Sequence, residues 1–564
     1  MRGEFARLVV LWVGWLRDSV DECEGVRSMR RLMVLVVCVC LQALSLVHPA
    51  VAQDGSVGGA GGDETGRVAV LLRGGEIYVG DGTAGFRGAV AVRGGRLEVF
   101  RESNSGELVL PEADVVVDCS GLVICPGFVD LHTHSDDPVL ERDTRACVNY
   151  LLQGCTTMVT GNCGFGPVDC GAYLAAIERQ GVGANVAHLL PQGSLRSEVI
   201  GKSDRKPSEE ELGRMRELAA KAMREGAFGM TTGLIYIPGT LTPTEELIEV
   251  ARVVGAGGGI YASHIRGEGA ELVSSIEEAL RIGEESGCAV HVSHLKASGK
   301  ANWGSLRLAI DRIERARAAG RRVTADQYPY TASSTSLEAT LLPAWAREGG
   351  REELQRRLGD VEQSQQVARA VQEKLQTSTR IQIASCNFNR SWVGKSLEEL
   401  SREQGRGMTE IVLEIERNGG ASIVNFNMSE EDVRLGMVRE WVATASDGGV
   451  KIFGATQPHP RSFGTFPRKI GRYAIEEGVM SLSAAIRSST GLPAEILGLK
   501  DRGLLKDGYA ADVVVFDAAT FRDGATFEDP WRGNSGLRHV LVNGVFAVYG
   551  GVPTGAMAGR AIRK

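Results

Sequence analysis

The sequence lacks an excess of positive charge. Its 564 residues include 63 Lys and Arg against 70 Asp and Glu, which gives a formal net charge of −7 at pH 7. Proteins that bind nucleic acids present a basic face to the phosphate backbone, so this balance argues against a nucleic-acid partner. With 43% hydrophobic and 24% charged residues, the composition is that of an ordinary soluble protein.

A comfortable membrane span is missing too. The apolar run from Leu32 to Val47 is shorter than the roughly 20 apolar residues that a transmembrane helix needs. It follows the basic segment 29–31 and precedes Ala50-Val51-Ala52, which is the order of regions in a secretory signal. We therefore expect translation to start at Met29 and cleavage to follow Ala52. The mature protein would then be exported, periplasmic or secreted, with no stable membrane span. The alternative is that the apolar run is a transmembrane anchor.

The cysteines do not suggest a small protein stapled by disulfides. Three of the eleven lie within residues 1–52, and the other eight are scattered through a chain large enough to bury a core without cross-links. We expect one of these eight, Cys163, to be a metal ligand instead.

Short alternating strands broken by Gly-Gly and Asp-Gly turns predict a β-rich segment at each end of the mature chain. The first covers residues 67–123, after a Gly-rich linker at 53–66. The second covers residues 505–564 and includes GYAADVVVFD and HVLVNGVFAVYGG. We expect these two segments to meet in space as one small β-sandwich.

Between them, residues 124–504 alternate short apolar strands with helical patterns, as in βα units around a parallel sheet. Eight strand candidates can be counted: ICPGFVDLH, CTTMVTGN, NVAHLLPQG, AFGMTTGL, GIYASH, CAVHVSH, RRVTAD and WVATASD. Eight strands close a (β/α)8 TIM barrel, so we predict the α/β class with this architecture. The gap before the last strand is too long for one helix and predicts an insertion at about 338–436.

Polar side chains gather at the ends of these strands. Six of them occupy separate positions there: His132, His134, Cys163, His264, His294 and Asp447. The carboxyl ends of barrel strands converge on one mouth, where the catalytic residues of this fold lie. Imidazole, thiolate and carboxylate together form a typical zinc ligand set, so the pattern predicts a metal site. A single His-x-His is more often structural, and His291, on the opposite face of its strand from His294, receives no role.

A set of longer motifs resembles a known family. PGFVDLHTHSDD, GNCGFGP, GAFGMTTGLIYIPG, YASHIRGE, HVSHLKASG, DQYPYTASST, ASDG and HPRSFGTFPR occur in the order found in D-aminoacylases (N-acyl-D-amino-acid deacylases) of the metal-dependent amidohydrolase superfamily. The resemblance extends from about residue 67 to 562. It implies a metallo-dependent barrel with a β-sandwich from both chain ends and an insertion before the last strand. It also implies zinc-dependent hydrolysis of N-acyl-D-amino acids, and the preference for D over L rests on it alone.

By motif position, the resemblance implies specific roles. A tightly bound zinc would lie on Cys163, His264 and His294, a second and weaker site would use His132 and His134, and Asp447 would be the catalytic acid/base. Four residues would bind the small-molecule substrate, in part through its α-carboxylate: Tyr236, Lys296, Ser334 and Arg461. The segments GNCGFGPVDC and CNFNRSW depart from the family pattern, which bears on substrate preference more than on mechanism.

Two other functions stay open from the sequence. A cyclic-amide hydrolase, such as a hydantoinase or dihydroorotase, usually holds two metals with a modified lysine on a middle strand, and no lysine ends such a strand here. A non-catalytic binding protein built on a barrel is the second alternative, and the full set of candidate ligands argues against it.

Overall fold

The computed structural model describes residues 67–103, 108–454 and 456–564. The predicted signal segment (1–52) and linker (53–66) lie outside the described residues. Within the described part of the chain, no helix is both long and apolar enough to cross a membrane.

The middle of the chain forms the predicted (β/α)8 barrel. Its strands are β6 (Phe128–Asp130), β7 (Cys155–Thr160), β8 (Asn185–His188), β9 (Leu190–Pro191), β10 (Gly229–Gly233), β11 (Ile260–His264), β12 (Ala289–Val292), β13 (Val323–Gln327) and β17 (Val442–Thr444). They form two parallel arcs, β6-β7-β8 and β9-β10-β11-β12-β13-β17. Because β8 and β9 are separated by Leu189 alone, they are two pieces of one strand, and the eight predicted strands are all present.

Asp130 joins the first and last strands of the barrel. Its carboxylate is fully buried, and Oδ1 accepts hydrogen bonds from the backbone N–H of His132 at 3.1 Å and of Ser446 at 3.0 Å. One residue further along, the N–H of Asp447 donates to the carbonyl oxygen of His132 at 2.9 Å. The first and last strands of the barrel therefore meet at His132 and Asp447, two of the predicted site residues.

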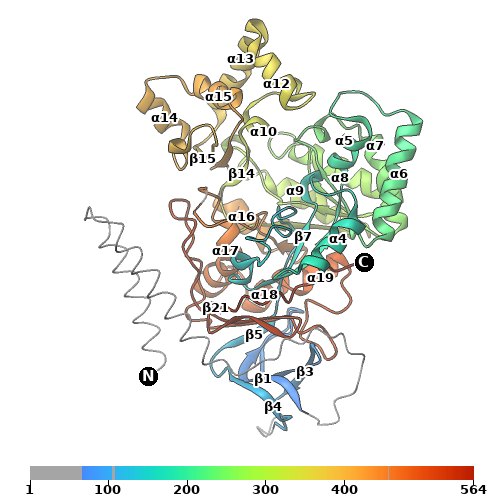
Figure 1. Cartoon of the computed structure of the whole chain (residues 1–564), viewed down its shortest axis with the longest axis vertical. Coiled ribbons are helices and arrows are strands. Elements are labelled where there is room, and N and C mark those ends of the chain that lie inside the picture. Colours follow the sequence, from blue (N-terminus) through green and yellow to red (C-terminus); the bar gives the residue numbers. More distant parts are fainter. Residues whose placement is uncertain (1–66, 104–107, 455) are drawn as a thin grey trace, which may run out of the picture. The chain divides into compact units, whose positions relative to one another are not determined.

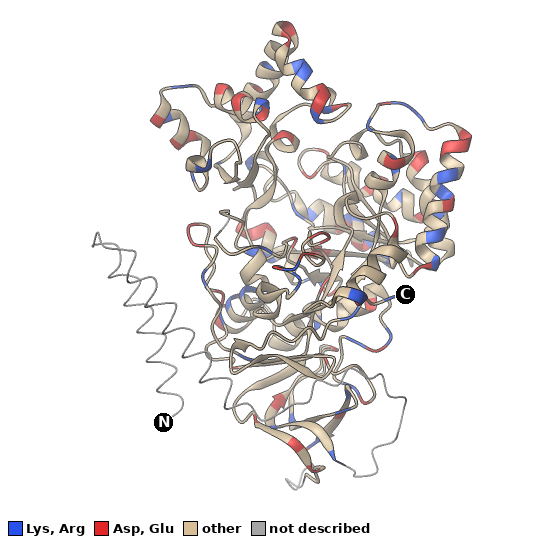
Figure 2. Cartoon of the chain, in the orientation of Figure 1, with Lys and Arg blue, Asp and Glu red and all other residues tan. Residues whose placement is uncertain are grey.

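Helices cover the outside of the barrel and bury their apolar faces against the strands (Figure 1). They include α4 (Cys170–Gln180), α5 (Gln192–Ile200), α6 (Glu209–Arg224), α7 (Thr244–Ala256), α8 (Leu272–Ser286), α9 (Leu306–Ala318), α16 (Glu430–Met437), α18 (Leu482–Ser489) and α19 (Gly491–Leu497). Local sequence fixes their ends: α6 begins with a capping box in which the hydroxyl of Ser208 accepts from the N–H of Glu211. Figure 2 shows acidic and basic residues interspersed along α6.

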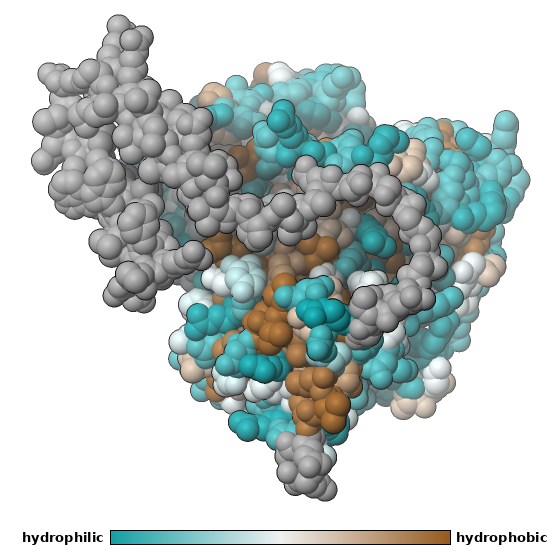
Figure 3. Space-filling model, turned by 60° about the horizontal axis from the view of Figure 1, so that its bottom comes forward, coloured by the Kyte–Doolittle hydropathy of each residue, from teal (hydrophilic) through white to brown (hydrophobic). Residues whose placement is uncertain are grey.

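Strands from both chain ends form a single nine-stranded sheet, so the predicted meeting of the two β-rich segments is observed. The strands are β1 (Val68–Ile77), β2 (Phe86–Arg93), β3 (Arg96–Arg101), β4 (Ala113–Asp118), β5 (Val123–Pro126), β18 (Val513–Phe516), β19 (Leu537–Val542), β20 (Val545–Tyr549) and β21 (Val552–Pro553). Their order is β21-β20-β19-β18-β5-β1-β2-β3, with β4 beside β1. Hydrogen bonding makes them one sheet, which folds around a core shared by Leu72, Val92 and Val513. Apolar side chains are also exposed on the face turned forward in Figure 3, over the part of the molecule that holds this sheet.

A separate subdomain precedes the last barrel strand (Figure 1, yellow to orange). It contains β14 (Ser333–Ser336), α10 (Leu337–Leu341), α11 (Ala344–Arg347), α12 (Arg351–Gly359), α13 (Val361–Thr377), β15 (Ile381–Ser385), α14 (Leu397–Gln404), α15 (Met408–Arg417) and β16 (Ser422–Asn425). The three strands pair antiparallel in the order β14-β16-β15, and the helices have a core of their own. The insertion was placed at 338–436 from sequence. The subdomain begins earlier, at β14, and α16 packs against α9 as a helix of the barrel.

Candidate metal centre

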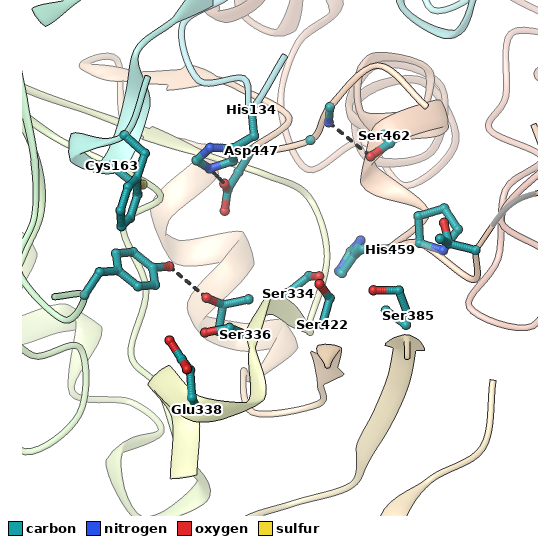
Figure 4. Close-up of a pocket in the computed structure, with 18 of the residues that line it drawn as sticks. His134, Cys163, Ser334, Ser336, Glu338, Ser385, Ser422, Asp447, His459 and Ser462 are labelled. Carbon is teal, nitrogen blue, oxygen red and sulfur yellow. Dashed lines mark hydrogen bonds and ion pairs between the residues drawn. The ribbon is translucent and has the colours of Figure 1, made fainter. Parts of the chain in front are cut away.

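The six predicted ligands lie together at the carboxyl end of the barrel strands. His132 and His134 follow β6, Cys163 follows β7, His264 ends β11, His294 follows β12 and Asp447 follows β17. Their ligand atoms form three overlapping groups, each within 4.8 Å: His132 with His134 and Cys163, Cys163 with His264 and His294, and His132 with His294 and Asp447. Figure 4 shows His134 and Asp447 in contact beside Cys163 at the wall of a cavity.

The group of Cys163, His264 and His294 fits a zinc ion. The sulfur of Cys163 lies 3.7 Å from Nδ1 of His264 and 3.8 Å from Nε2 of His294, and the two nitrogens are 2.8 Å apart. Ligand atoms at about 2.0–2.3 Å from a tetrahedral zinc lie roughly 3.3–3.8 Å from one another. The two sulfur–nitrogen distances fall in this range, whereas the two nitrogens lie closer together, so the imidazole rings would move apart to hold the ion. All three side chains are buried, so the ligand atoms face one another with little access to water. A thiolate and two imidazoles in this arrangement are a donor set that could hold a metal ion.

Three of the site residues have left-handed backbone conformations. Cys163 has φ 52°, His294 has φ 38° and Asp447 has φ 49°, and each lies just past the end of its strand. Such conformations cost of order 1–3 kcal/mol for residues other than glycine, and they persist only where the surrounding structure imposes them. The turns therefore aim these side chains into the barrel mouth at the expense of local stability, which is typical of a functional site.

The charges around Cys163 favour its thiolate form. Burial alone would raise the pKa of this thiol, but the positive charge of His132 and hydrogen bonds from His132, His134 and His264 bring the pKa well below its usual value. Nε2 of His132 lies 3.3 Å from the sulfur. A deprotonated sulfur is the form that binds zinc.

Asp447 is a buried carboxylate held between a histidine and an arginine. Its Oδ1 lies 3.0 Å from Nε2 of His134, and its Oδ2 lies 2.8 Å from Nη1 of Arg461. Burial would raise the pKa of Asp447, but the guanidinium of Arg461, followed by His132, holds the pKa well below its usual value. Asp447 is therefore ionised and can accept a proton.

Two cavities open from this centre, and residues of β14 line both. The first, of about 560 Å³, is lined by His134, Cys163, Asp447 and Arg461 on the barrel side. Its opposite wall comes from the insertion and includes Ser334, Ser336, Glu338, Ser385 and Ser422 (Figure 4). The second, of about 490 Å³, is lined by His264, His294 and Lys296. Both cavities reach His134 and Asp447.

The structure distributes the four predicted substrate-binding residues between these cavities. Arg461 lines the first and also donates from Nη2 to the carbonyl oxygen of Ser334 at 3.1 Å. The hydroxyl of Tyr236 lies 2.9 Å from Oγ1 of Thr335, and Tyr236 and Ser334 border both cavities. Lys296 lines the second cavity only, where its ammonium lies 2.5 Å from Oε1 of Glu268.

Sequence reasoning missed two carboxylates that contact the candidate ligands. Oε1 of Glu268 lies 3.0 Å from Nδ1 of His294, and Oδ2 of Asp326 lies 3.4 Å from Nδ1 of His132. His291, which received no role, lies 2.8 Å from the same oxygen of Asp326. The available signal was position: Glu268 follows His264 by four residues, and Asp326 ends the strand RRVTAD.

Comparison with known proteins agrees with this geometry. The model of the amidohydrolase family matches residues 115–548. D-aminoacylase from Alcaligenes xylosoxydans xylosoxydans is 35% identical over 518 residues, which cover 88% of this chain and 97% of that protein. A solved structure of N-acyl-D-glutamate deacylase from Bordetella bronchiseptica, complexed with zinc and a phosphonate inhibitor, is 31% identical with a TM-score of 0.77. It is matched over 88% of this chain and 100% of that chain.

A solved structure of D-aminoacylase that concerns its binuclear metal centre is 32% identical, with a TM-score of 0.75 over 88% of this chain and 100% of that chain. These matches span nearly the whole described part of the sequence, and they share its barrel. The chain therefore belongs to the amidohydrolase family, in the branch that contains D-aminoacylase and the N-acyl-D-amino-acid deacylases.

Proposed function

We propose that this protein hydrolyses the amide bond of N-acyl-D-amino acids and releases a carboxylic acid and a free D-amino acid. The observation that carries the proposal is the convergence of Cys163, His264 and His294 beside an ionised Asp447 at the mouth of a barrel. The relatives named for this activity match almost their whole length, which supports the same reaction class here.

In this proposal Cys163, His264 and His294 hold one zinc tightly, and His132 and His134 contribute to a second, weaker site. Zinc in such a site acts as a Lewis acid towards a carbonyl group and makes water acidic enough to attack near neutral pH. The mixed ligand set and the zinc in the structure of the Bordetella relative support this choice of metal.

Asp447 is the proposed acid/base. Its carboxylate would accept a proton from the attacking water and deliver that proton to the departing amine nitrogen, so that water and amide become acid and amine. Arg461 and the buried surroundings favour the ionised form that starts this cycle. A positioned carboxylate in this role typically contributes ~10²–10⁴-fold to the rate.

Arg461 is the strongest candidate for binding the substrate α-carboxylate. It lies in the first cavity next to Asp447, and a guanidinium can bind a carboxylate with two parallel hydrogen bonds. We propose that Ser334 in β14 also binds the substrate. Tyr236, whose hydroxyl contacts Thr335 of the same strand, would bind it as well. Lys296 would act from the second cavity, where Glu268 already neutralises it.

The panel that tests this function uses metal-loaded protein and N-acetyl-D- and N-acetyl-L-amino acids, with release of the free amine as the readout. Hydantoin and dihydroorotate are included because a cyclic-amide hydrolase would open them instead. We expect release from D substrates, with little from L substrates and none from the cyclic amides. Absence of release from every N-acyl-D-amino acid, with zinc bound, would contradict the proposal.

We also propose export of the mature protein, on the basis of the signal pattern that ends at Ala52. Mass analysis of the native protein should find Gln53 as the first residue, outside the cytoplasm. An intact N-terminus at Met1 or Met29 in the cytoplasmic fraction would exclude this.

A further inference from the structure

Asp326 is a buried carboxylate at the base of the metal centre that the proposed mechanism does not use. It lies in β13, is 1% exposed, and contacts residues that lie in or just after β12 and β6. Oδ1 accepts a hydrogen bond from the backbone N–H of His294 at 2.7 Å. Oδ2 lies 3.4 Å from Nδ1 of His132 and 2.8 Å from Nε2 of His291.

The contact with His132 determines which ring nitrogen faces the centre. Nε2 of His132 lies 3.3 Å from the sulfur of Cys163 and 3.4 Å from Oδ1 of Asp447, whereas Nδ1 points to Asp326. A carboxylate can only accept a hydrogen bond, so it requires the proton on Nδ1. Nε2 is then the nitrogen whose lone pair a metal would take, in place of the proton that it shares with Cys163 in the metal-free protein.

The contact with His294 acts on the backbone instead of the ring. His294 has the left-handed φ of 38°, and its N–H is fixed by Oδ1 of Asp326. This bond holds the turn that aims the ring of His294 at His264 and Cys163. One carboxylate therefore restrains a proposed ligand of each metal site.

His291 holds the carboxylate of Asp326 in place. Its Nδ1 lies 2.9 Å from Oγ1 of Thr324, and its Nε2 lies 2.8 Å from Asp326, so the ring is held at both ends. The carboxylate of Asp326 thus has a fixed direction before any ligand binds. The histidine that looked structural from sequence alone restrains the residue that orients the ligands.

We propose that Asp326 is a positioning residue shared by the two metal sites, which sets the tautomer of His132 and holds the backbone turn of His294. The inference rests on the metal roles given under the proposed function. Carboxylates that orient metal-binding histidines typically account for about 10–100-fold in metal affinity.

The substitution Asp326→Asn separates the two contacts. The amide oxygen of asparagine can still accept from the N–H of His294, but the amide NH2 replaces the oxygen that faces His132. A donor at this position favours the proton on Nε2 of His132, which blocks the nitrogen needed for the metal. We expect the second zinc to bind ~10–100-fold more weakly, with the tight zinc retained.

The measurement is zinc affinity of the full mature chain, from competition with a chromophoric chelator, together with zinc stoichiometry after dialysis. Asp512→Asn is the matched control, because Asp512 is a buried carboxylate directly before β18 that pairs with Arg502, outside the metal centre. It tests whether loss of a buried carboxylate weakens zinc binding by destabilisation alone. We expect its zinc affinities to equal those of the wild type.

A double-mutant cycle tests the route through His132. If Asp326 acts through this ring, Asp326→Asn should have little further effect on second-site affinity in a His132→Asn background. His291→Gln, which leaves Asp326 in place, should give a smaller loss and serves as the test if Asp326→Asn fails to fold.

Unchanged second-site affinity in folded Asp326→Asn, or in His291→Gln where the first variant does not fold, would overturn the inference. So would an equal loss in Asp512→Asn, full additivity in the cycle, or a wild type that binds a single zinc at every concentration. These outcomes leave the hydrolysis of N-acyl-D-amino acids untouched, because that function is read from amine release by the wild type.

Discussion

Replacing Arg461 with methionine removes two interactions that can be measured separately. The side chain is 5% exposed and forms an ion pair with Asp447 at 2.8 Å. In the proposed function it also binds the substrate α-carboxylate. Loss of the first interaction affects every substrate, whereas loss of the second affects only substrates that carry this carboxylate.

The magnitudes follow from the type of bond. A hydrogen bond to a charged group is worth roughly 1.5–3 kcal/mol, and about 1.4 kcal/mol corresponds to a factor of ten. For Arg461→Met we expect kcat/KM to fall by a further ~10–100-fold on an N-acetyl-D-amino acid, relative to its α-carboxamide. The fall in kcat/KM that the acid and the carboxamide share measures the loss of the contact between Arg461 and Asp447.

The pH profile identifies that common loss. Because Arg461 holds the pKa of Asp447 well below its usual value, its removal should raise this pKa. The ionised fraction of Asp447 would then fall at a higher pH, and the acid limb of kcat/KM should move upward for both substrates. Arg461→Lys, which keeps the charge without the planar fork, should keep the acid limb near its wild-type position and recover part of the carboxylate preference.

Equal losses on the acid and its carboxamide would refute the role of Arg461 in binding the α-carboxylate, even if the pH profile moved as expected. A preference of the wild type for the carboxamide would contradict the deacylase proposal itself.

Three further predictions concern the metal, the proton and the stability of the barrel. Cys163→Ala should lose most of the tightly bound zinc and the activity with it, as measured by metal analysis after dialysis, and full zinc with full turnover would exclude Cys163 as a ligand. Asp447→Asn should lower kcat by ~10²–10⁴-fold while the tight zinc remains, and a near-normal kcat would remove Asp447 from the catalytic role. Arg196→Met should lower the free energy of unfolding by about 3–5 kcal/mol, because it leaves the buried carboxylate of Glu246, now 3.1 Å from the guanidinium, without its cation. Urea unfolding measures this loss, and a change below about 1 kcal/mol would show that the pair is not needed.

The ligands could be predicted because each lies at or just past the end of a predicted strand, and the barrel brings these strand ends together. His132 and His134 share one face by strand alternation, and His264 and His294 end apolar runs that belong to parallel strands. Once such strands close a barrel, their carboxyl ends meet. Predicting the barrel was therefore enough to predict that these residues lie close together.

The same rule places Asp326 at a strand end, but it could not show that this carboxylate contacts His132. It lies 194 residues from His132 in sequence, and no local pattern indicates which side chains of neighbouring strands face each other. His291 received no role because its side chain lies on the opposite face of the strand from His294. The alternation of side chains along one strand does not show which residue of the next strand, here Asp326, that side chain contacts. The start of the insertion was missed for a related reason: β14 is a run of serine and threonine, which lacks the apolar alternation of a strand.

The strand order of the terminal sheet also sets an order of events during synthesis. β5 pairs with β18, and the paired residues Val123 and Phe516 are about 390 positions apart. Until residues 513–553 have left the ribosome, β1, β2 and β5 have an open edge and an uncovered apolar face. Most barrel strands, by contrast, pair with the strand that precedes or follows them in sequence, although closure between β6 and β17 also waits for residues up to Asp447. Shortening the chain at its C-terminal end would therefore expose the N-terminal strands to aggregation instead of trimming a dispensable tail.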